Sequence, residues 1–237
     1  GLVGYNNSGT ITSCYATGSV SEGNNAGGLV GYNSGSITSC YATGLVTGHT
    51  VGGLVGWNYE GTLTGCYATG SVSGTGAVGG LMGYNDYGTG SITSCYATGS
   101  VTGEAYVGGL VGINHGTLTD CYATGAVSGN SLVGGLVGLN GGELTACFWD
   151  KETSDQTVGV GGGTSTGVTG KTTVQMKTLT TFTLAGWDFV NSWGIGNGQT
   201  YPYLKPFNRV NPADINYSGT VDFKDFAIIA ENWLEGI

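Results

Sequence analysis

The sequence predicts an all-β protein: a right-handed parallel β-solenoid of about six turns, followed by a small C-terminal cap and a calcium-loop helix. Composition is the first observation, because 49 of the 237 residues are Gly and only 3 are Pro, which is too glycine-rich for an ordinary globular domain. A repeat is the second, because Gly-Leu-Val-Gly (Gly-Leu-Met-Gly in one copy) recurs every 25 to 29 residues, starting at Gly1, Gly28, Gly53, Gly80, Gly109 and Gly135. Self-similarity at such a period indicates stacked units.

Each repeat consists of short β-rich runs separated by turns. The runs Gly-Leu-Val-Gly-Tyr-Asn, Thr-Ile-Thr-Ser-Cys-Tyr-Ala-Thr-Gly and Ser-Val-Ser contain the residue types that favour strands. Gly and Asn between the runs accept positive φ, so the chain can fold back within one layer. A single repeat cannot bury its apolar side alone, whereas repeats stacked about 4.8 Å apart pair every strand in parallel with its copies. Parallel crossovers are usually right-handed, which gives the expected hand.

Stacking predicts columns of equivalent residues along the axis. Two columns are expected to be structural, an apolar one and an amide one at the turns: Leu2, Leu29, Leu54, Leu81, Leu110 and Leu136; and Asn6, Asn33, Asn58, Asn85, Asn114 and Asn140. Another holds six cysteines, and an aromatic residue follows each of them: Cys14, Cys40, Cys66, Cys95, Cys121 and Cys147, followed by Tyr15, Tyr41, Tyr67, Tyr96, Tyr122 and Phe148.

The cysteine column has two interpretations. A ladder of small buried side chains is favoured, because in-register side chains point parallel rather than at each other. Neighbours such as Cys14 and Cys40 nevertheless lie within the Cα separation that disulfides span, so a disulfide is permitted without being required. A zinc site is poorly supported, since no His shares the spacing of the cysteines.

The aromatic columns also have two interpretations. The five tyrosines that follow cysteines, and the partial column Tyr5, Tyr32, Trp57 and Tyr84, could form an exposed stripe that binds a sugar or another molecule. Rings stacked along a sheet already stabilise it by a few tenths to about 1 kcal/mol per cross-strand pair, so structure alone can account for both columns.

The unit Gly-Leu-Val-Gly…Cys-Tyr-Ala-Thr-Gly resembles the GLUG repeat of bacterial surface proteins, adhesins and some large surface peptidases, and the resemblance covers residues 1–149. Residues 150–207 resemble the segment that commonly follows such arrays, and we expect them to cap the solenoid around Trp149, Trp187 and Trp193. The resemblance implies a non-catalytic accessory region, with any enzymatic activity in other domains.

The tail, residues 208–237, contains a calcium-loop pattern. Oxygen donors stand at loop positions 1, 3, 5, 9 and 12, and a Gly at position 6 allows the tight turn. The expected ligands are Asp214, Asn216, Ser218, Thr220 through its carbonyl, Asp222 and Asp225. With the helix Phe223–Leu234, the loop resembles one half of a dockerin module, which implies a single calcium site. The apolar stripe of that helix needs cover, from the solenoid, the cap or another surface protein.

Charge and spacing argue against several functions. Residues 1–150 contain no Lys or Arg, so the repeats are unsuited to nucleic acid. Neither His49 nor His115 stands at a spacing that ties it to a Ser or Cys nucleophile, which argues against an enzyme. No apolar run is long enough to span a membrane. We therefore expect a non-catalytic structural or adhesive protein, extracellular or at the cell surface, able to self-associate head to tail. The alternative is a carbohydrate-binding accessory module of a larger secreted enzyme.

Overall fold

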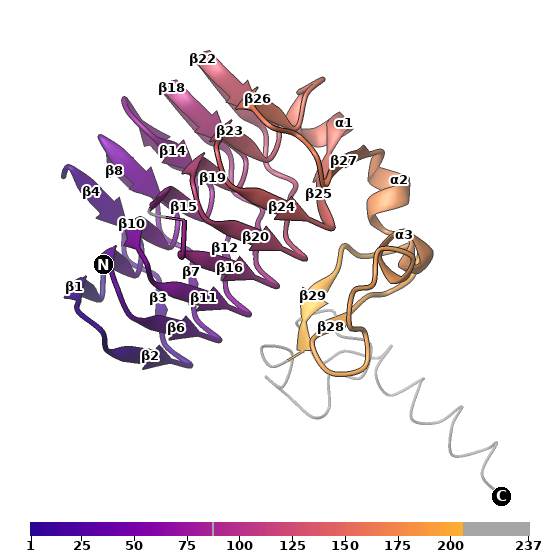
Figure 1. Cartoon of the computed structure of the whole chain (residues 1–237), viewed down its shortest axis with the longest axis horizontal. Coiled ribbons are helices and arrows are strands. Elements are labelled where there is room, and N and C mark those ends of the chain that lie inside the picture. The colour runs from indigo at the N-terminus through magenta and orange to yellow at the C-terminus, as the bar shows by residue number, and fades with distance from the viewer. Residues whose placement is uncertain (87, 206–237) are drawn as a thin grey trace, which may run out of the picture.

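The computed structural model describes residues 1–86 and 88–205, and it confirms a parallel β-solenoid of about six turns (Figure 1). Strands of successive turns lie side by side, and residues 25 to 29 positions apart in sequence are paired in register, as in Val3 with Val30 and Leu63 with Ile92. The calcium loop and helix expected in the tail lie outside the described residues.

Four parallel sheets form the sides of the solenoid. Sheet A contains the Gly-Leu-Val-Gly-Tyr-Asn runs, in the order β1 (Val3–Asn6), β5 (Val30–Asn33), β10 (Val55–Tyr59), β15 (Met82–Asp86), β19 (Val111–Asn114), β23 (Val137–Asn140) and β26 (Val160–Gly163). Sheet B contains the Thr-Ile-Thr runs, in the order β2 (Thr10–Thr12), β6 (Ser36–Thr38), β11 (Thr62–Thr64), β16 (Ser91–Thr93), β20 (Thr117–Thr119) and β24 (Glu143–Thr145).

The other two sheets complete each turn. Sheet C contains the Tyr-Ala pairs: β3 (Tyr15–Ala16), β7 (Tyr41–Ala42), β12 (Tyr67–Ala68), β17 (Tyr96–Ala97), β21 (Tyr122–Ala123), β25 (Cys147–Asp150) and β27 (Val168–Lys171). Sheet D contains the valine runs: β4 (Asn25–Gly27), β8 (Val46–Gly48), β9 (Thr50–Gly52), β13 (Val72–Gly74), β14 (Val78–Gly79), β18 (Val101–Gly108) and β22 (Val127–Gly134).

A sharp bend separates sheets B and C in a run that the sequence analysis treated as continuous. The residue before each cysteine has a left-handed backbone, with φ between 51° and 61°, and only one of the six is Gly: Ser13, Ser39, Gly65, Ser94, Asp120 and Ala146. The bend turns the following Cys side chain into the interior.

The interior is filled by ladders of like residues. In sheet B, alternation along the strands places the Ile and Leu column inside, where Ile92 and Leu118 are fully buried. Before each strand of sheet A, the Leu column also points inward, and Leu54 is fully buried beside Val55. Buried valines such as Val51 and Val78 form a second cluster behind sheet D. Because each turn contacts mainly its two neighbours, the core is a column rather than a sphere.

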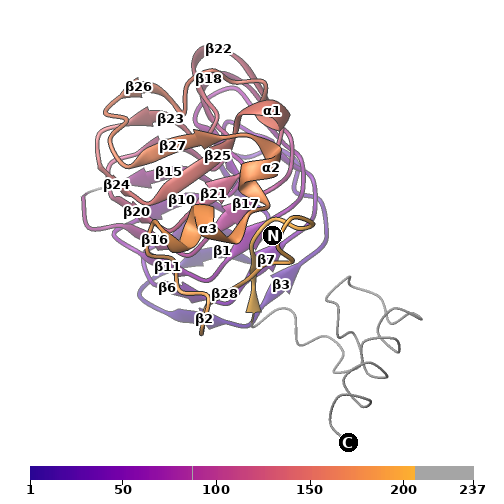
Figure 2. The same ribbon diagram turned by 90° about the vertical axis from the view of Figure 1, so that its right-hand side faces the viewer.

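The segment after residue 149 closes one end (Figure 2, which faces that end). It contains α1 (Lys151–Ser154), α2 (Thr173–Met176), α3 (Leu179–Thr183) and the antiparallel pair β28 (Trp193–Gly194) and β29 (Tyr203–Leu204). Its strands β26 and β27 continue sheets A and C, so part of a further turn follows residue 149.

The three tryptophans expected in the core of the cap lie in two places. Trp187 and Trp193 form an aromatic cluster with Phe182, whereas Trp149 lies in the solenoid core. Its indole packs directly against Gly135, where a Cβ would collide with the ring. Trp149 therefore fills the interior of the last turn.

Candidate functional site

The column of tyrosines on sheet C is a continuous stack. Ring centroids are 4.9 to 5.1 Å apart between neighbours from Tyr15 to Tyr122, and planes differ by 9° or less. Each ring lies face to face with the next, so only ring edges point away from the stack. A sugar that stacks on an aromatic face finds such a face only at the end of the column.

Exposure of this stack falls steadily along the axis. Tyr15 is 59% exposed, whereas Tyr122 is 1% exposed. Trp187 and Trp193 of the cap cover Tyr122, with ring centroids 6.2 and 6.0 Å away, and its hydroxyl donates a hydrogen bond to the carbonyl of Pro202 at 2.5 Å. The expected stripe from Tyr15 to Tyr122 is thus corrected: its C-terminal end is the docking site of the cap.

Burial also sets the acidity of these phenols. It raises the pKa of Tyr67 to about 12, and it raises the pKa of Tyr96 and Tyr122 further above the ordinary value. The covered tyrosines therefore remain protonated at neutral pH and serve as apolar bodies with one hydroxyl donor.

The second aromatic column lies on sheet A. Tyr5 and Tyr32 stack with centroids 4.7 Å apart, and Trp57 and Tyr84 continue the row at tilted angles. Tyr5 is 60% exposed, but the Nε1 of Trp57 is buried and has no partner among the described residues. As on sheet C, one open ring face lies at the first turn.

The six cysteines form an interior ladder of free thiols. Five are fully buried and Cys14, in the first turn, is half-buried. The backbone N–H of Cys40 donates to the sulfur of Cys66 at 3.4 Å, and the thiol of Cys66 donates to the carbonyl of Thr64 at 3.3 Å. Burial raises the pKa of the Cys121 thiol well above its ordinary value, so it stays a neutral, unreactive thiol.

The asparagine column is a hydrogen-bonded ladder. The side-chain amide of each Asn donates to the side-chain oxygen of the next, over 2.7 to 2.9 Å, from Asn6 to Asn140. Asn140 continues the ladder by donating to Thr164. Every amide also donates to a carbonyl of its own turn, as in Asn58 with Gly61 at 2.8 Å. These buried amides hold the turns in register, and from Asn33 onward each one both donates and accepts within the ladder.

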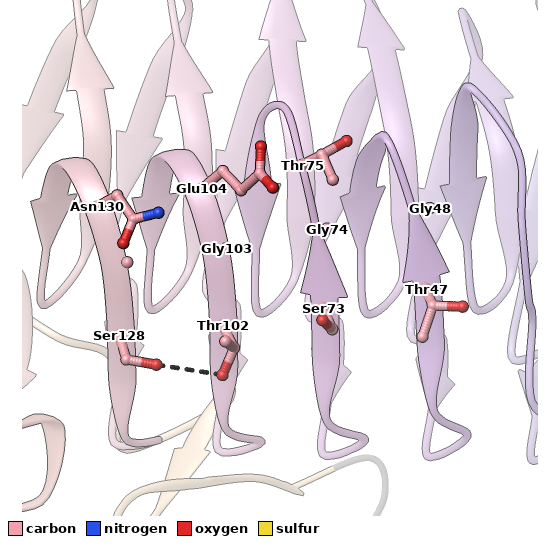
Figure 3. A pocket seen from close by; sticks show the side chains of 11 residues that line it. Thr47, Gly48, Ser73, Gly74, Thr75, Thr102, Gly103, Glu104, Ser128 and Asn130 are labelled. Carbon is pink, nitrogen blue, oxygen red and sulfur yellow. Dashed lines mark hydrogen bonds between the residues drawn. The ribbon is translucent and has the colours of Figure 1, made fainter.

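A shallow polar groove crosses four turns on the outer side of sheet D (Figure 3). It has a volume of about 670 Å³ and is lined by a row of hydroxyls, Thr47, Ser73, Thr102 and Ser128, with Thr75, Glu104 and Asn130 on the other side. Within the row, the hydroxyls of Thr102 and Ser128 are 3.2 Å apart and hydrogen-bonded. Hydroxyls, an amide and a carboxylate are the groups that bind the hydroxyls of a sugar.

The outer face of sheet B is a surface that the sequence analysis did not single out. Its outward positions form two rows of six, Thr10, Ser36, Thr62, Ser91, Thr117 and Glu143, and Thr12, Thr38, Thr64, Thr93, Thr119 and Thr145. We call these two rows the threonine face. The signal that could have revealed it is a Thr or Ser two residues before a Thr, which recurs in five of the six turns.

The two histidines lie on different sides of the solenoid, His49 between β8 and β9 and His115 after β19. The Nδ1 of His49 is 2.9 Å from the hydroxyl of Thr75, and His115 lies edge-on to Tyr84. In residues 1–86 and 88–205, no three His, Cys, Asp or Glu side chains are grouped to hold a metal ion. Among the same residues, no helix is long and apolar enough to cross a membrane. The six expected calcium ligands lie outside the described residues.

The comparisons with known proteins agree with this architecture. The family model described as the GLUG motif matches four segments, residues 22–47, 47–73, 74–102 and 103–128, so the chain contains GLUG repeats. A crystal structure from Bacteroides ovatus, described as that of a "putative immunoglobulin A1 protease", has the same fold with a TM-score of 0.59. It is 22% identical and the match covers 85% of this chain and 76% of that one. No curated protein matches the chain.

Proposed function

We propose that this GLUG-repeat β-solenoid is a non-catalytic structural or adhesive module that works outside the cell or at its surface. The observation that supports it is the continuity of the ladders: the Asn and Cys ladders run through six turns, and the tyrosine stack on sheet C runs through five. Such a column is stiff, and it presents long faces on which the same group recurs at every turn. A stiff spacer with repeated faces suits adhesion better than chemistry at one centre.

Self-association through the first turn is part of this proposal. Strands β1, β2 and β3 are each paired on one side only, and Leu2, Tyr5 and Tyr15 are more than half exposed there. The side-chain oxygen of Asn6 accepts no hydrogen bond from the described residues, although the equivalent oxygen in each of the next five turns accepts one from the turn before it. A turn supplied by the C-terminal region of a second copy would add one strand to each of the three sheets and extend the Asn ladder, giving a head-to-tail filament.

Electron microscopy of the full chain at high concentration tests the filament. We expect filaments from the wild type, and short rods from a double variant, Tyr5→Lys with Tyr15→Lys, which places charge on the open edge. Leu45→Lys is the matched control, because Leu45 is 47% exposed on the side of the solenoid. Short rods from the wild type would refute head-to-tail assembly.

Carbohydrate binding is the second candidate function, and the groove on sheet D favours it. The aromatic columns offer a free ring face only at the first turn, so we assign the sugar site to the groove rather than to the tyrosine stripe. A glycan array probed with the wild type and with Asn130→Ala tests this. Signals that the variant loses would support the groove, and no signal above background would end the candidate.

The proposed calcium site in residues 214–225 has its own test. Calorimetry of the full chain with calcium should show one site that Asp214→Ala abolishes, because the first loop position supplies a carboxylate ligand. Equal heats from both proteins would refute the site. If calcium binds, docking of the following helix on another surface protein becomes the natural role of the tail.

A further inference from the structure

The threonine face is unusual in what it contains. Eleven of its twelve positions are Thr or Ser and the twelfth is Glu143, at the end of the first row. The second row is Thr in all six turns. Between the rows, the inward positions are Ile or Leu, and from Ile37 to Leu144 they are buried. The core fixes these strands from behind, and their outer side chains are exposed or half-buried.

The hydroxyls of this face are not used by the protein itself. None of the eleven Thr and Ser side chains forms a hydrogen bond within the described residues. On sheet D the hydroxyls of Thr102 and Ser128 are hydrogen-bonded across neighbouring turns, and just before β13 and β18 the hydroxyl of Ser100 donates to that of Ser71. The threonine face contains no such hydroxyl pair among the described residues, so all of its hydroxyl donors and acceptors are available to an external partner.

The spacing of the hydroxyls is fixed in two directions. Successive turns are about 4.8 Å apart across the strands, and the two rows are about 6.6 Å apart along them, because outward residues are two positions apart. Figure 1 shows β2, β6, β11, β16, β20 and β24 stacked side by side, one after another along the solenoid axis. The array is therefore a rectangular lattice of hydroxyl and methyl groups.

The charge of this surface narrows the choice of partner. No Lys or Arg occurs in residues 1–150, and Glu143 is the single charged residue in the two rows. An ionic polymer has nothing to pair with, and no aromatic ring face lies on this sheet for a sugar to stack on. The remaining match is a neutral solid whose own donors and acceptors repeat at these distances. Water molecules in ice repeat at similar distances along two perpendicular directions of a crystal face.

We propose that the threonine face binds ice. Hydroxyls at lattice positions hold a layer of water in the order of the crystal, and the methyl groups between them exclude other water. Each contact is weak, and the twelve positions act together because the solenoid holds them in register along one sheet. The inference goes beyond the structural role proposed above, and it uses a different surface from the open first turn, the groove and the tail.

Partition of the full chain into slowly growing ice tests the proposal. We expect the wild type to be enriched in the ice fraction relative to a non-binding protein of similar size, and to inhibit recrystallisation of small ice grains. The double variant Thr64→Tyr with Thr93→Tyr places two large rings in the middle of the lattice and should lose both effects. These side chains point outward, so the fold should survive, and circular dichroism checks that it does.

The matched control is Thr102→Tyr, which adds the same ring to the hydroxyl array on sheet D and should keep wild-type enrichment. Exclusion of the wild type from ice, or equal enrichment of the sheet B variant, would overturn the proposal. Sedimentation with insoluble cellulose or chitin tests whether the threonine face binds a crystalline polysaccharide rather than ice. Binding there that the sheet B variant loses, without enrichment in ice, would assign the face to a crystalline polysaccharide instead.

Discussion

The solenoid, residues 1–149, and the capping segment, residues 150–205, are held together in opposite ways. In the solenoid, the same contacts recur at every turn, so stability is spread along a column of Asn, Cys, Tyr and aliphatic ladders. In the cap, unique contacts converge on a few side chains, chiefly Trp187 and Trp193 against Tyr122. A substitution in the first turn of the solenoid should therefore destabilise it less than the same substitution in a middle turn. In the cap, one substitution in the aromatic cluster should disrupt the whole segment.

The largest expected effect is in the cap. Trp193→Ala removes a fully buried ring whose centroid lies 4.6 Å from Trp187 and 6.0 Å from Tyr122, and it should destabilise the cap by about 3–5 kcal/mol. Because solenoid turns depend mainly on their neighbours, the solenoid should remain folded. Chemical denaturation followed by tryptophan fluorescence and by far-ultraviolet circular dichroism separates the two regions. Simultaneous loss of both signals would contradict the comparison.

The next effect is in the middle of the Asn ladder. Asn58→Ala leaves the amide of Asn33 and the side-chain oxygen of Asn85 without their partners in the interior, and it should lower the free energy of unfolding by about 2–4 kcal/mol. Asn6→Ala is the control, because Asn6 has only one neighbour in the ladder and should lose about 1 kcal/mol. Urea denaturation measures both. Equal losses would mean that the ladder does not act as a chain.

The ionisation of tyrosines at alkaline pH should also distinguish the solenoid from the cap. Folding raises the pKa of Tyr67 and of Tyr201 to about 12, against about 10 in an unfolded chain. The stability that they contribute is complete below pH 10 and is lost as pH rises towards 12, because the unfolded chain releases the protons first. Burial holds the pKa of Tyr122 higher still, so its ionisation requires the cap to open. Ultraviolet absorbance of phenolate should show a cooperative late step, which Trp193→Ala shifts to lower pH.

The smallest effect concerns the bend before each cysteine. Ser94 has φ of 51°, a conformation that Gly adopts freely, and Gly65 already occupies the equivalent position one turn earlier. Ser94→Gly should therefore change stability by less than about 1 kcal/mol, because relief of strain offsets the entropy that Gly loses on folding. Ser94→Val should destabilise more, since a β-branched side chain resists positive φ. Thermal unfolding ranks the two, and the reverse order would contradict the assignment of the bend.

The structure of the solenoid could be predicted from the sequence, whereas the packing of the cap could not. Identical residues at identical spacing, such as Cys40 and Cys66, determine a column once parallel pairing is assumed, so the register could be predicted turn by turn. The bend at Ser13 and its equivalents was missed because Ser carries no strong signal for positive φ. The covering of Tyr122 was missed because it depends on Trp193, 71 residues later, through contacts that do not repeat.

The candidate sites divide in the same way. The order and register of the aromatic column on sheet C were predicted from the sequence. Its ring faces are covered by the neighbouring rings, however, and this depends on side-chain orientation rather than on spacing. The threonine face corresponds to Thr-x-Thr in three repeats and to Ser-x-Thr in two, and the sequence analysis used these residues only as an indication of strands. Its unbonded hydroxyls could be recognised only by comparison with the bonded pair Thr102 and Ser128.

The most direct test of the stiff, in-register column is a set of distances along one row of the threonine face. In a Cys14→Ala background, which removes the one partly exposed thiol, spin labels at Thr12→Cys with Thr145→Cys, five turns apart, should lie about 24 Å apart with a narrow distribution. Thr38→Cys with Thr119→Cys, three turns apart, should give about 14 Å. Distances that do not grow with the number of turns, or that are broadly distributed, would contradict it.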